Sequence, residues 1–135
     1  GFIRPATIVH KFFRALNGES KMSKRDPMSM LTLNDSPEIV KKKINMALTG
    51  GRKTVEEQRR LGGVPEDSVV YELYYYHFVD DDRKVGKVYD DYKAGRLLDG
   101  DMKKGITEIV TKFLEQHQKK REKMMPVAEK LVYGK

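Results

Sequence analysis

The chain has 135 residues, of which 39% are apolar and 35% are charged, so it can bury one small core beneath a strongly solvated surface. It contains no cysteine, which excludes disulfides, thiolate zinc sites and cysteine nucleophiles. No apolar run approaches the roughly 20 residues that span a bilayer, and the first residues do not have the pattern of a signal peptide. We therefore expect a cytoplasmic protein without a membrane partner.

The formal net charge of +7 is unevenly distributed along the chain. Residues 1–64 and 101–135 are basic, and the segment 65–100 between them is acidic. Basic surfaces attract phosphate-rich partners, because Lys and Arg replace the counterions of a nucleic acid backbone. Charge alone favours such a partner only weakly, since a soluble basic domain without one has the same composition.

The first third of the chain predicts a strand and a loop. Residues 6–13 are rich in β-branched and aromatic side chains, which is typical of a buried strand, and the turn pair Asn17-Gly18 follows. Residues 19–29 form a polar, basic segment that we expect to be a mobile loop. The composition then shifts near Asp35, where we place a boundary between a domain part at 1–34 and a helical domain at 35–135.

The remaining residues predict a bundle of about five helices. Asp35 or Ser36 can cap the first helix, and Thr54 can cap the second. The third helix is expected at 65–79, apolar nearly all round and therefore central. The run 80–82 starts the fourth, which ends at Gly95.

The fifth helix is expected to be capped by Asp99 and to continue through Lys123, until Pro126 breaks or restarts it. The run 41–43 of three lysines is interpreted as a solvated helix face. The three histidines are scattered and, without cysteine, form no metal constellation, so no protein metal site is predicted.

One short motif has a chemical interpretation: the run Lys21-Met22-Ser23-Lys24-Arg25. It places two lysines and a hydroxyl in a turn-flanked segment, which can fold over a polyphosphate and neutralise the charge of departing pyrophosphate. A solvated basic loop explains the five residues equally well by themselves. The context of a strand and turn before the motif and a capped helix after it favours the chemical interpretation.

The motif resembles the KMSKS signature of class I aminoacyl-tRNA synthetases, with Arg25 in place of the final serine. Two longer runs, PATIVHKFFRALNGESKMSKRDP and TGGRKTVEEQRRLGG, are similar to segments of the archaeal and eukaryotic tryptophanyl enzymes. The runs Asp80-Asp81-Asp82 and Gly100-Asp101-Met102-Lys103-Lys104 match the C-terminal domain of the same group. The resemblance covers nearly the whole chain in order.

The resemblance implies that ATP, with its Mg²⁺, activates tryptophan as an adenylate, and that the tryptophanyl group then moves to tRNA. Lys21 and Lys24 would be catalytic, and Lys21, Met22, Ser23, Lys24 and Arg25 would form the ATP-phosphate site. The contribution of Arg25, which replaces the signature serine, stays open.

The resemblance also implies that the helical domain reads the tRNA anticodon. Arg52, Lys53 and Lys103 lie at the matching positions, and cationic donors on a helical scaffold can read exposed loop bases. The resemblance does not decide whether Lys53 contacts a base or a phosphate.

The HIGH signature and an amino-acid pocket of such enzymes are not found in the sequence. We therefore expect a C-terminal fragment, inactive by itself, of an enzyme that forms homodimers. The fold class expected is mainly α, a helical anticodon-binding bundle preceded by the last strand and KMSKS loop of a Rossmann-like catalytic domain. Two alternatives are a helical tRNA-binding module without catalysis and a structural helical domain whose KMSKR run is coincidental.

Overall fold

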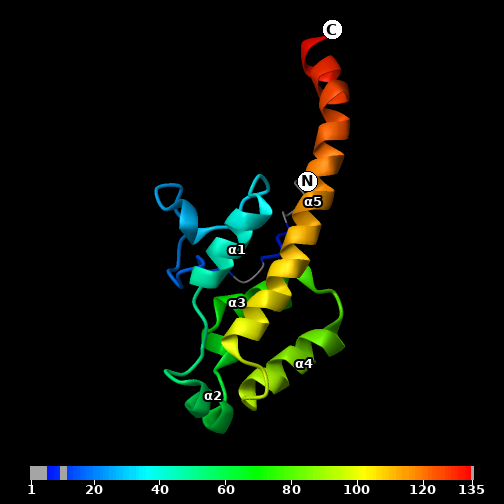
Figure 1. The fold of residues 1–135 in the computed structure, drawn as a ribbon. Coiled ribbons are helices and arrows are strands. Elements are labelled where there is room, and N and C mark those ends of the chain that lie inside the picture. Colours follow the sequence, from blue (N-terminus) through cyan, green and yellow to red (C-terminus); the bar gives the residue numbers. More distant parts are fainter. Residues whose placement is uncertain (1–5, 10–11, 135) are drawn as a thin grey trace.

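The computed structural model describes residues 6–9 and 12–134, which form helices joined by loops (Figure 1). The α-helices of this part of the chain are α1 (Pro37–Met46), α2 (Val55–Leu61), α3 (Val69–Leu73), α4 (Asp82–Lys93) and α5 (Asp99–Tyr133). Two 3₁₀ turns, η1 (Pro27–Ser29) and η2 (Pro65–Asp67), and the π-helix η3 (Tyr74–Phe78) complete the elements. The mainly α prediction is confirmed. No helix among the described residues has the length and apolarity to cross a membrane.

Local sequence chemistry sets most helix ends. The side chains of Ser36, Thr54 and Asp81 accept hydrogen bonds from backbone N–H groups in the first turns of α1, α2 and α4. Gly62 and Gly95 follow α2 and α4 with φ of 73° and 72°, a backbone conformation that glycine adopts without steric cost. These boundaries confirm the predicted starts of α1, α2 and α4 and the predicted ends of α2 and α4, whereas α1 ends at Met46, before the predicted end at 49–51.

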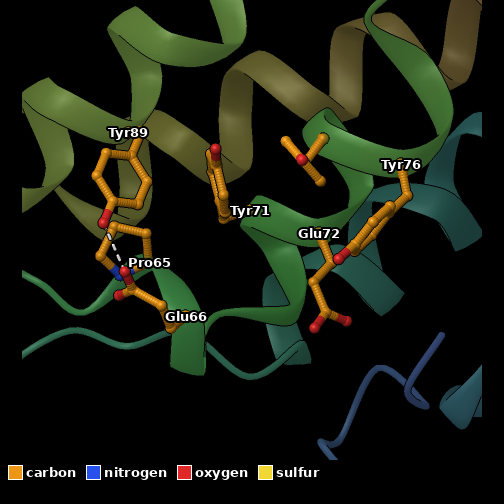
Figure 2. A pocket seen from close by; sticks show the side chains of 7 residues that line it. Pro65, Glu66, Tyr71, Glu72, Tyr76 and Tyr89 are labelled. Atoms are coloured by element: carbon orange, nitrogen blue, oxygen red, sulfur yellow. Dashed lines mark hydrogen bonds between the residues drawn. The ribbon is translucent and has the colours of Figure 1, made fainter. Parts of the chain in front are cut away.

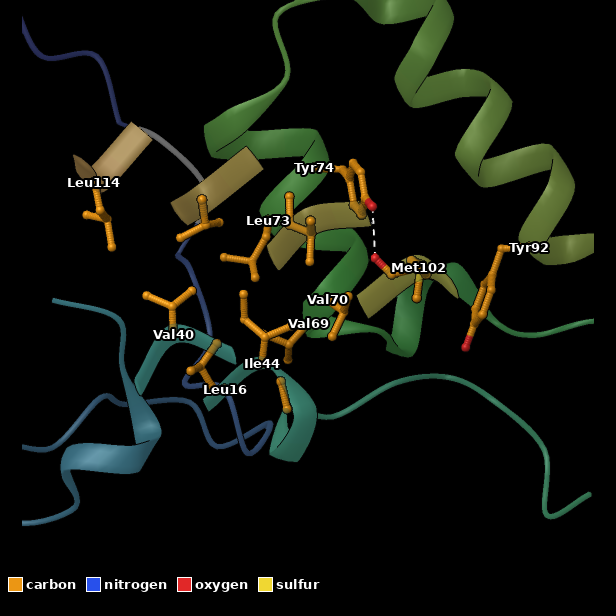
Figure 3. Close-up of a cluster of buried hydrophobic side chains, with 13 residues drawn as sticks. Leu16, Val40, Ile44, Val69, Val70, Leu73, Tyr74, Tyr92, Met102 and Leu114 are labelled. Carbon is orange, nitrogen blue, oxygen red and sulfur yellow. Dashed lines mark hydrogen bonds between the residues drawn. The ribbon is translucent and has the colours of Figure 1, made fainter. Parts of the chain in front are cut away.

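The core lies where α1, α3 and α5 meet (Figure 3). The buried residues of α5 recur every four positions, so they form one stripe along the helix. Tyr74 joins this core, and its buried hydroxyl donates a 2.8 Å hydrogen bond to the carbonyl of Met102. The main apolar side chains are Leu16, Val40, Ile44, Val69, Val70, Leu73, Met102, Ile106, Val110 and Leu114. Leu16 belongs to this core although it precedes the domain boundary predicted between residues 34 and 35. The boundary itself stays a prediction.

The third predicted helix is not continuous. Residues 65–79 fold as the turn η2, the short α3 and the π-helix η3. Ser68 caps α3 through a 3.1 Å hydrogen bond from the backbone N–H of Tyr71, which separates α3 from η2. A helix buries only the face that its neighbours cover, so Tyr74 is 6% exposed while Tyr75 is 57% exposed. The prediction of a fully central helix is therefore wrong for Tyr75.

The strand predicted at 6–13 is absent from the described residues. Ala6–Val9 and Phe12–Phe13 are coil, and Ile8 and Val9 are exposed. A strand needs a neighbour to pair its backbone groups, and no second strand occurs among the described residues. The two remaining residues of the prediction, His10 and Lys11, lie outside the described residues.

Helix α5 continues through Pro126 instead of ending there, and its last part projects beyond the helical body (Figure 1). Proline removes one N–H donor from the helix. The flanking residues include Met125, Ala128 and Lys130, which favour the helical conformation. The prediction of a break at Pro126 is therefore wrong.

The lysine run at 41–43 is only partly solvated. Lys43 is 4% exposed, and its Nζ lies 2.7 Å from a carboxylate oxygen of Asp35. Partial burial by itself raises the pKa of Asp35, but hydrogen bonds from Lys43 and Thr32 outweigh burial and hold this pKa below its ordinary value. A buried lysine needs such a partner, since an unpaired charge in a protein interior is costly.

We predict that Asp35→Asn lowers the free energy of unfolding at pH 7 by roughly 3 kcal/mol, because it leaves Lys43 buried without a counter-charge. Asp35 has a depressed pKa, so its contribution is present above the unfolded pKa of about 3.9 and is lost as pH falls through the folded pKa. Urea unfolding at several pH values measures both effects.

The matched control is Lys42→Gln, at an exposed neighbour on α1. It should change the stability by less than about 0.5 kcal/mol. A loss for Asp35→Asn that equals the control, or that does not shrink at acid pH, would contradict the assigned ion pair.

Candidate functional site

Hydrogen bonds around Ser29 fold the KMSKR segment, and the mobility expected for 19–29 stays a prediction. Ser29 is 2% exposed, and its hydroxyl donates a 2.7 Å hydrogen bond to the carbonyl of Asp26. The same hydroxyl oxygen accepts a 3.3 Å hydrogen bond from the backbone N–H of Ser23. The carbonyl of Ser29 accepts a 2.8 Å hydrogen bond from Leu16 N–H, so Ser29 ties the loop to the chain before it.

The loop side chains divide into an anchor and free cations. Met22 is half-buried and lines an apolar hollow of about 200 Å³ with Leu16, Leu73 and other apolar side chains. Lys21, Lys24 and Arg25 are exposed and form no hydrogen bond or ion pair through their side chains with any described residue. The hollow is lined by Phe13, Leu16, Met22, Met30, Leu31, Leu73, His77 and Phe78.

Ser23 has a local role in this loop. Its hydroxyl oxygen accepts a 3.2 Å hydrogen bond from the backbone N–H of Arg25, which stabilises the turn. The loop therefore presents three positive side chains to solvent from a backbone held by Met22, Ser23 and Ser29. This arrangement can receive a polyphosphate.

A second polar cluster is centred on Asp99. The prediction that Asp99 caps α5 is wrong. The cap residue is Leu98, and Asp99 is the first helical residue. The Asp99 carboxylate instead accepts hydrogen bonds from Thr49 Oγ1 at 2.6 Å, from Gln58 Nε2 at 3.1 Å and from the hydroxyl of Tyr92 at 2.6 Å. These donors lie after α1, on α2 and on α4, so one carboxylate joins three segments to the start of α5.

The glycine pair 50–51 lets the chain close around this cluster. A Cβ atom on Gly51 would overlap both carboxylate oxygens of Asp99, and one on Gly50 would overlap the carbonyl oxygen of Val64. The carbonyl of Gly50 also accepts a 2.8 Å hydrogen bond from Val64 N–H. Only glycine allows these backbone approaches, which explains the Gly-Gly sequence at this position.

The structure brings Arg52 and Lys103 to this cluster. Arg52 Nε donates a 2.9 Å hydrogen bond to the carbonyl of Gly62. Burial raises the pKa of Tyr92, and so does Asp99, whereas the Arg52 guanidinium acts in the opposite direction. Lys103 lies one helical turn after Asp99.

Lys103 Nζ donates a 2.7 Å hydrogen bond to the carbonyl of Asn45, in the last turn of α1. Partial burial lowers the pKa of Lys103, and the nearby Asp99 opposes this shift. Lys53 is exposed, and its side chain has no hydrogen bond or ion pair with a described residue. Lys103 thus has a structural contact that the sequence did not indicate.

An open hollow of about 390 Å³ lies beside Lys103, between α1 and α5. Two lysines, Lys41 and Lys104, are among the residues that line this hollow. Its lining residues are Lys41, Asn45, Gly100, Lys104, Thr107 and Glu108. Asn45, whose carbonyl accepts the Lys103 hydrogen bond, is one of them, so the hollow borders this contact.

The two clusters lie at different ends of the helical body (Figure 1). The loop 19–29 lies beside α1, whereas α2, α4 and the first turn of α5 lie together at the other end. Sequence reasoning identified the cations of both clusters but not Thr49, Gln58, Tyr92 and Asp99, which organise the second. The sequence signal for Asp99 was a helix start, which does not reveal its partners. Among the described residues, no group of three or more acidic or histidine side chains is placed to hold a metal ion.

Comparison with known proteins matches residues 1–115 to the family model of class I tRNA synthetases (W and Y). The chain belongs to this family. Among its relatives, a tryptophan–tRNA ligase of Hyperthermus butylicus is 47% identical over 123 residues, which are 91% of this chain and 33% of the relative. One of Methanocaldococcus jannaschii is 42% identical over 134 residues, 99% of this chain and 36% of the relative.

A solved structure supports the same class I synthetase assignment. The tryptophanyl-tRNA synthetase of Aeropyrum pernix superposes with a TM-score of 0.86 at 44% identity, over 90% of this chain and 33% of that one. The chain therefore spans about a third of the length of the curated relatives it matches. The helical arrangement of the described residues is the one found in this family.

We predict that Gly51→Ala in this synthetase chain lowers the free energy of unfolding by roughly 1–3 kcal/mol, because the added methyl overlaps the Asp99 carboxylate. Gly86→Ala on α4 is the matched control, since a Cβ atom at this position would meet nothing within 4 Å. It should raise stability by up to about 1 kcal/mol through helix propensity. Thermal unfolding followed by circular dichroism measures both, and equal effects would contradict the close packing of Gly51 on Asp99.

Proposed function

We propose that this chain is the part of a tryptophan–tRNA ligase that supplies the ATP-phosphate loop and the anticodon-reading surface. Residues 1–34 would close a Rossmann-like catalytic domain, and residues 35–135 would form the helical anticodon-binding domain. The observation that carries the proposal is the KMSKR loop, which exposes its cations from an anchored backbone in a chain of the class I synthetase family. The whole enzyme would act as a cytoplasmic homodimer.

The loop chemistry follows from charge. In the activation step, a carboxylate oxygen of tryptophan attacks the α-phosphorus of ATP, and the bond to pyrophosphate breaks. Negative charge then builds on the leaving pyrophosphate, where fixed cations lower the barrier most. Lys21 and Lys24 are the lysines free to move onto these oxygens, and Ser23 and Arg25 would complete the phosphate site. Mg²⁺ carried by the nucleotide would neutralise further phosphate charge.

In the full-length enzyme, we predict that Lys24→Ala slows adenylate formation by roughly 10²–10³-fold, as for the loss of one charge-stabilising donor. Tryptophan affinity should change little, because the lysine acts where charge develops. Single-turnover kinetics with ATP and tryptophan measure the rate and the affinity separately.

The control is Lys42→Ala, an exposed lysine on α1 outside the loop, which should leave the rate unchanged. An unchanged rate for Lys24→Ala would transfer the proposed role to Lys21 or Arg25. If Lys21→Ala and Arg25→Ala were also silent, the ATP-loop proposal would be wrong.

The anticodon proposal rests on the second cluster. Arg52 and Lys53 follow Gly51, which packs on Asp99, and Lys103 lies one turn along α5. Unstacked loop bases offer edges to a guanidinium fork or an ammonium donor. The open hollow beside Lys103, with Lys41 and Lys104, could receive a base or its phosphate. Lys53 would contact either a base or a phosphate from its exposed position.

One observation favours the alternative of a non-catalytic RNA-binding module. The contacts that build the Asp99 cluster and hold Lys103 come from residues 45–103, so the helices form this surface without the loop 19–29. In this alternative the isolated chain binds tRNA but has no part in activation. RNA binding without any effect of loop substitutions on the enzyme would distinguish it from the ligase proposal.

We predict that the chain binds an anticodon stem-loop bearing CCA more tightly than one with a scrambled anticodon. Affinity should fall with added salt, because part of the binding is phosphate contact. Lys103→Ala should reduce the preference between the two RNAs, whereas loss of a phosphate-contacting lysine weakens both about equally. Titration of both RNAs at two salt concentrations measures this.

Lys112→Ala is the matched control, an exposed lysine on α5 outside the hollow. It should leave the preference unchanged. Equal affinity of the unsubstituted chain for the two stem-loops would remove the anticodon-reading proposal, and no binding at low salt would favour a purely structural domain.

A further inference from the structure

A cavity of about 330 Å³ lies among η2, α3, η3 and α4, apart from both clusters described above (Figure 2). Four of the seven tyrosines of the chain line it, together with two carboxylates. Its lining residues are Pro65, Glu66, Tyr71, Glu72, Tyr75, Tyr76 and Tyr89. A size near the lower end of the range for ligand pockets suits one side-chain-sized group.

The walls are aromatic faces that attract positive charge. The ring of Tyr71 lies with its centroid 6.1 Å from that of Tyr75 and 5.7 Å from that of Tyr89. Burial, followed by the charges of neighbouring groups, raises the pKa of Tyr71 to about 12, so its phenol stays neutral at physiological pH. A cation already uses this cluster, since Lys93 Nζ lies 5.2 Å from the centroid of the Tyr89 ring.

The two carboxylates differ in how well they are paired. Glu66 accepts a 2.5 Å hydrogen bond from the Tyr89 hydroxyl, which lowers the pKa of Glu66 and keeps it ionised. Glu72 is 6% exposed, and its Oε1 accepts a 3.1 Å hydrogen bond from Arg14 Nε. Its Oε2 is buried and has no hydrogen-bond donor. A buried acceptor without a donor costs free energy, which an incoming N–H group would recover.

Glu72 can reach a ligand by a small movement. The terminal torsion of a glutamate is broad, so a partial rotation about it can turn Oε2 toward a donor in the cavity, at the expense of part of the Arg14 contact. Figure 2 shows the Tyr89 hydroxyl on Glu66 and Tyr76 beside Glu72, with the Tyr71 ring between them, and all five side chains line the same space. This combination of neutral π faces and an incompletely paired carboxylate is complementary to an organic cation with N–H donors.

We propose that this cavity binds an organic cation of the guanidinium class, such as an arginine side chain. A guanidinium is planar and stacks on aromatic rings, and its fork of N–H donors matches a carboxylate. A compact ammonium would use the π faces but would pair with the carboxylates less completely. The acidic character of the segment 65–100, in a chain of net charge +7, agrees with a positively charged ligand.

Tyrosine fluorescence provides the test, because the chain contains no tryptophan and four of its seven tyrosines line the cavity. The chain is titrated with n-butylguanidinium and with n-butylurea, an uncharged molecule of nearly the same shape. Saturable quenching by the guanidinium, with at least about tenfold weaker binding of the urea, is expected from the loss of a charge-assisted hydrogen bond. Equal binding of both probes, or no binding of either, would overturn the proposal.

Two substitutions separate the carboxylate from the aromatic wall. Glu72→Gln should weaken n-butylguanidinium binding about tenfold or more while leaving n-butylurea binding unchanged. Tyr75→Leu, at a largely exposed wall residue, should weaken both probes and keep the charge preference. Glu115→Gln is the control, an exposed carboxylate of α5 outside the cavity.

Circular dichroism establishes that each variant is folded before titration. Should Glu72→Gln not fold, Tyr75→Leu and the comparison of the two probes still decide the outcome. Unchanged binding is expected only for Glu115→Gln, and Glu72→Gln and Tyr75→Leu variants that bind as tightly as the unsubstituted chain would overturn the assignment of the cavity.

The source of the guanidinium is distinguished by a second ligand, the capped tripeptide acetyl-Gly-Arg-Gly-amide. Binding at least as tight as that of n-butylguanidinium would assign an arginine side chain of a polypeptide. Binding of n-butylguanidinium without the peptide would assign a small-molecule cation. Both results uphold a guanidinium site, and failure of both ligands contradicts it.

Discussion

The carboxylate of Asp99 is the interaction on which the end of the molecule formed by α2, α4 and the start of α5 depends. A negative group in the first turn of α5 is favoured by the helix dipole, and three donors from other segments converge on it. Tyr92 is fully buried to reach it, and Gly51 packs so closely that no side chain fits. The arrangement therefore determines the path of the chain from α1 to α2, and with it the position of Arg52 and Lys53.

Helix α5 connects this end to the rest of the molecule. Its buried stripe packs against α1 and α3, and the carbonyl of Met102 receives the hydroxyl of Tyr74. At the other end, Met22 anchors the KMSKR loop in a hollow lined by Leu73 and Phe78, and Leu73 belongs to the core. The KMSKR loop and the Asp99 cluster thus rest on one continuous core. This continuity gives a physical route by which the helices hold the loop in position.

Local chemistry in the sequence predicted the features that depend on local contacts. The caps at Ser36, Thr54 and Asp81 each use a side chain and a backbone group within three residues, so the sequence around them is sufficient. The free cations of the loop were recognised because the motif and its flanks are contiguous. The mainly α class followed from the same kind of signal, repeated along the chain.

The wrong predictions concern contacts between residues far apart in the sequence, or a strand for which the described residues offer no pairing partner. Asp99 looked like a cap because its donors, among them Thr49 fifty positions earlier, are not visible from its neighbours. Lys43 lay in a run of lysines, and only the fold reveals that it faces inward toward Asp35. Residues 6–13 have strand composition, but composition supplies no partner strand. Tyr75 differs from Tyr74 because α5 covers only one side of η3.

The central claim is that the surface around Asp99, and not the KMSKR loop or the end of α5, meets the anticodon. Amide chemical shift mapping of the ¹⁵N-labelled chain, titrated with the CCA stem-loop, tests it most directly. The account predicts shift changes concentrated at Gly50–Lys53, at Lys103 and around the hollow between α1 and α5. Changes confined to residues 19–29 or to α5 beyond residue 119, with the Asp99 surroundings unaffected, would contradict it.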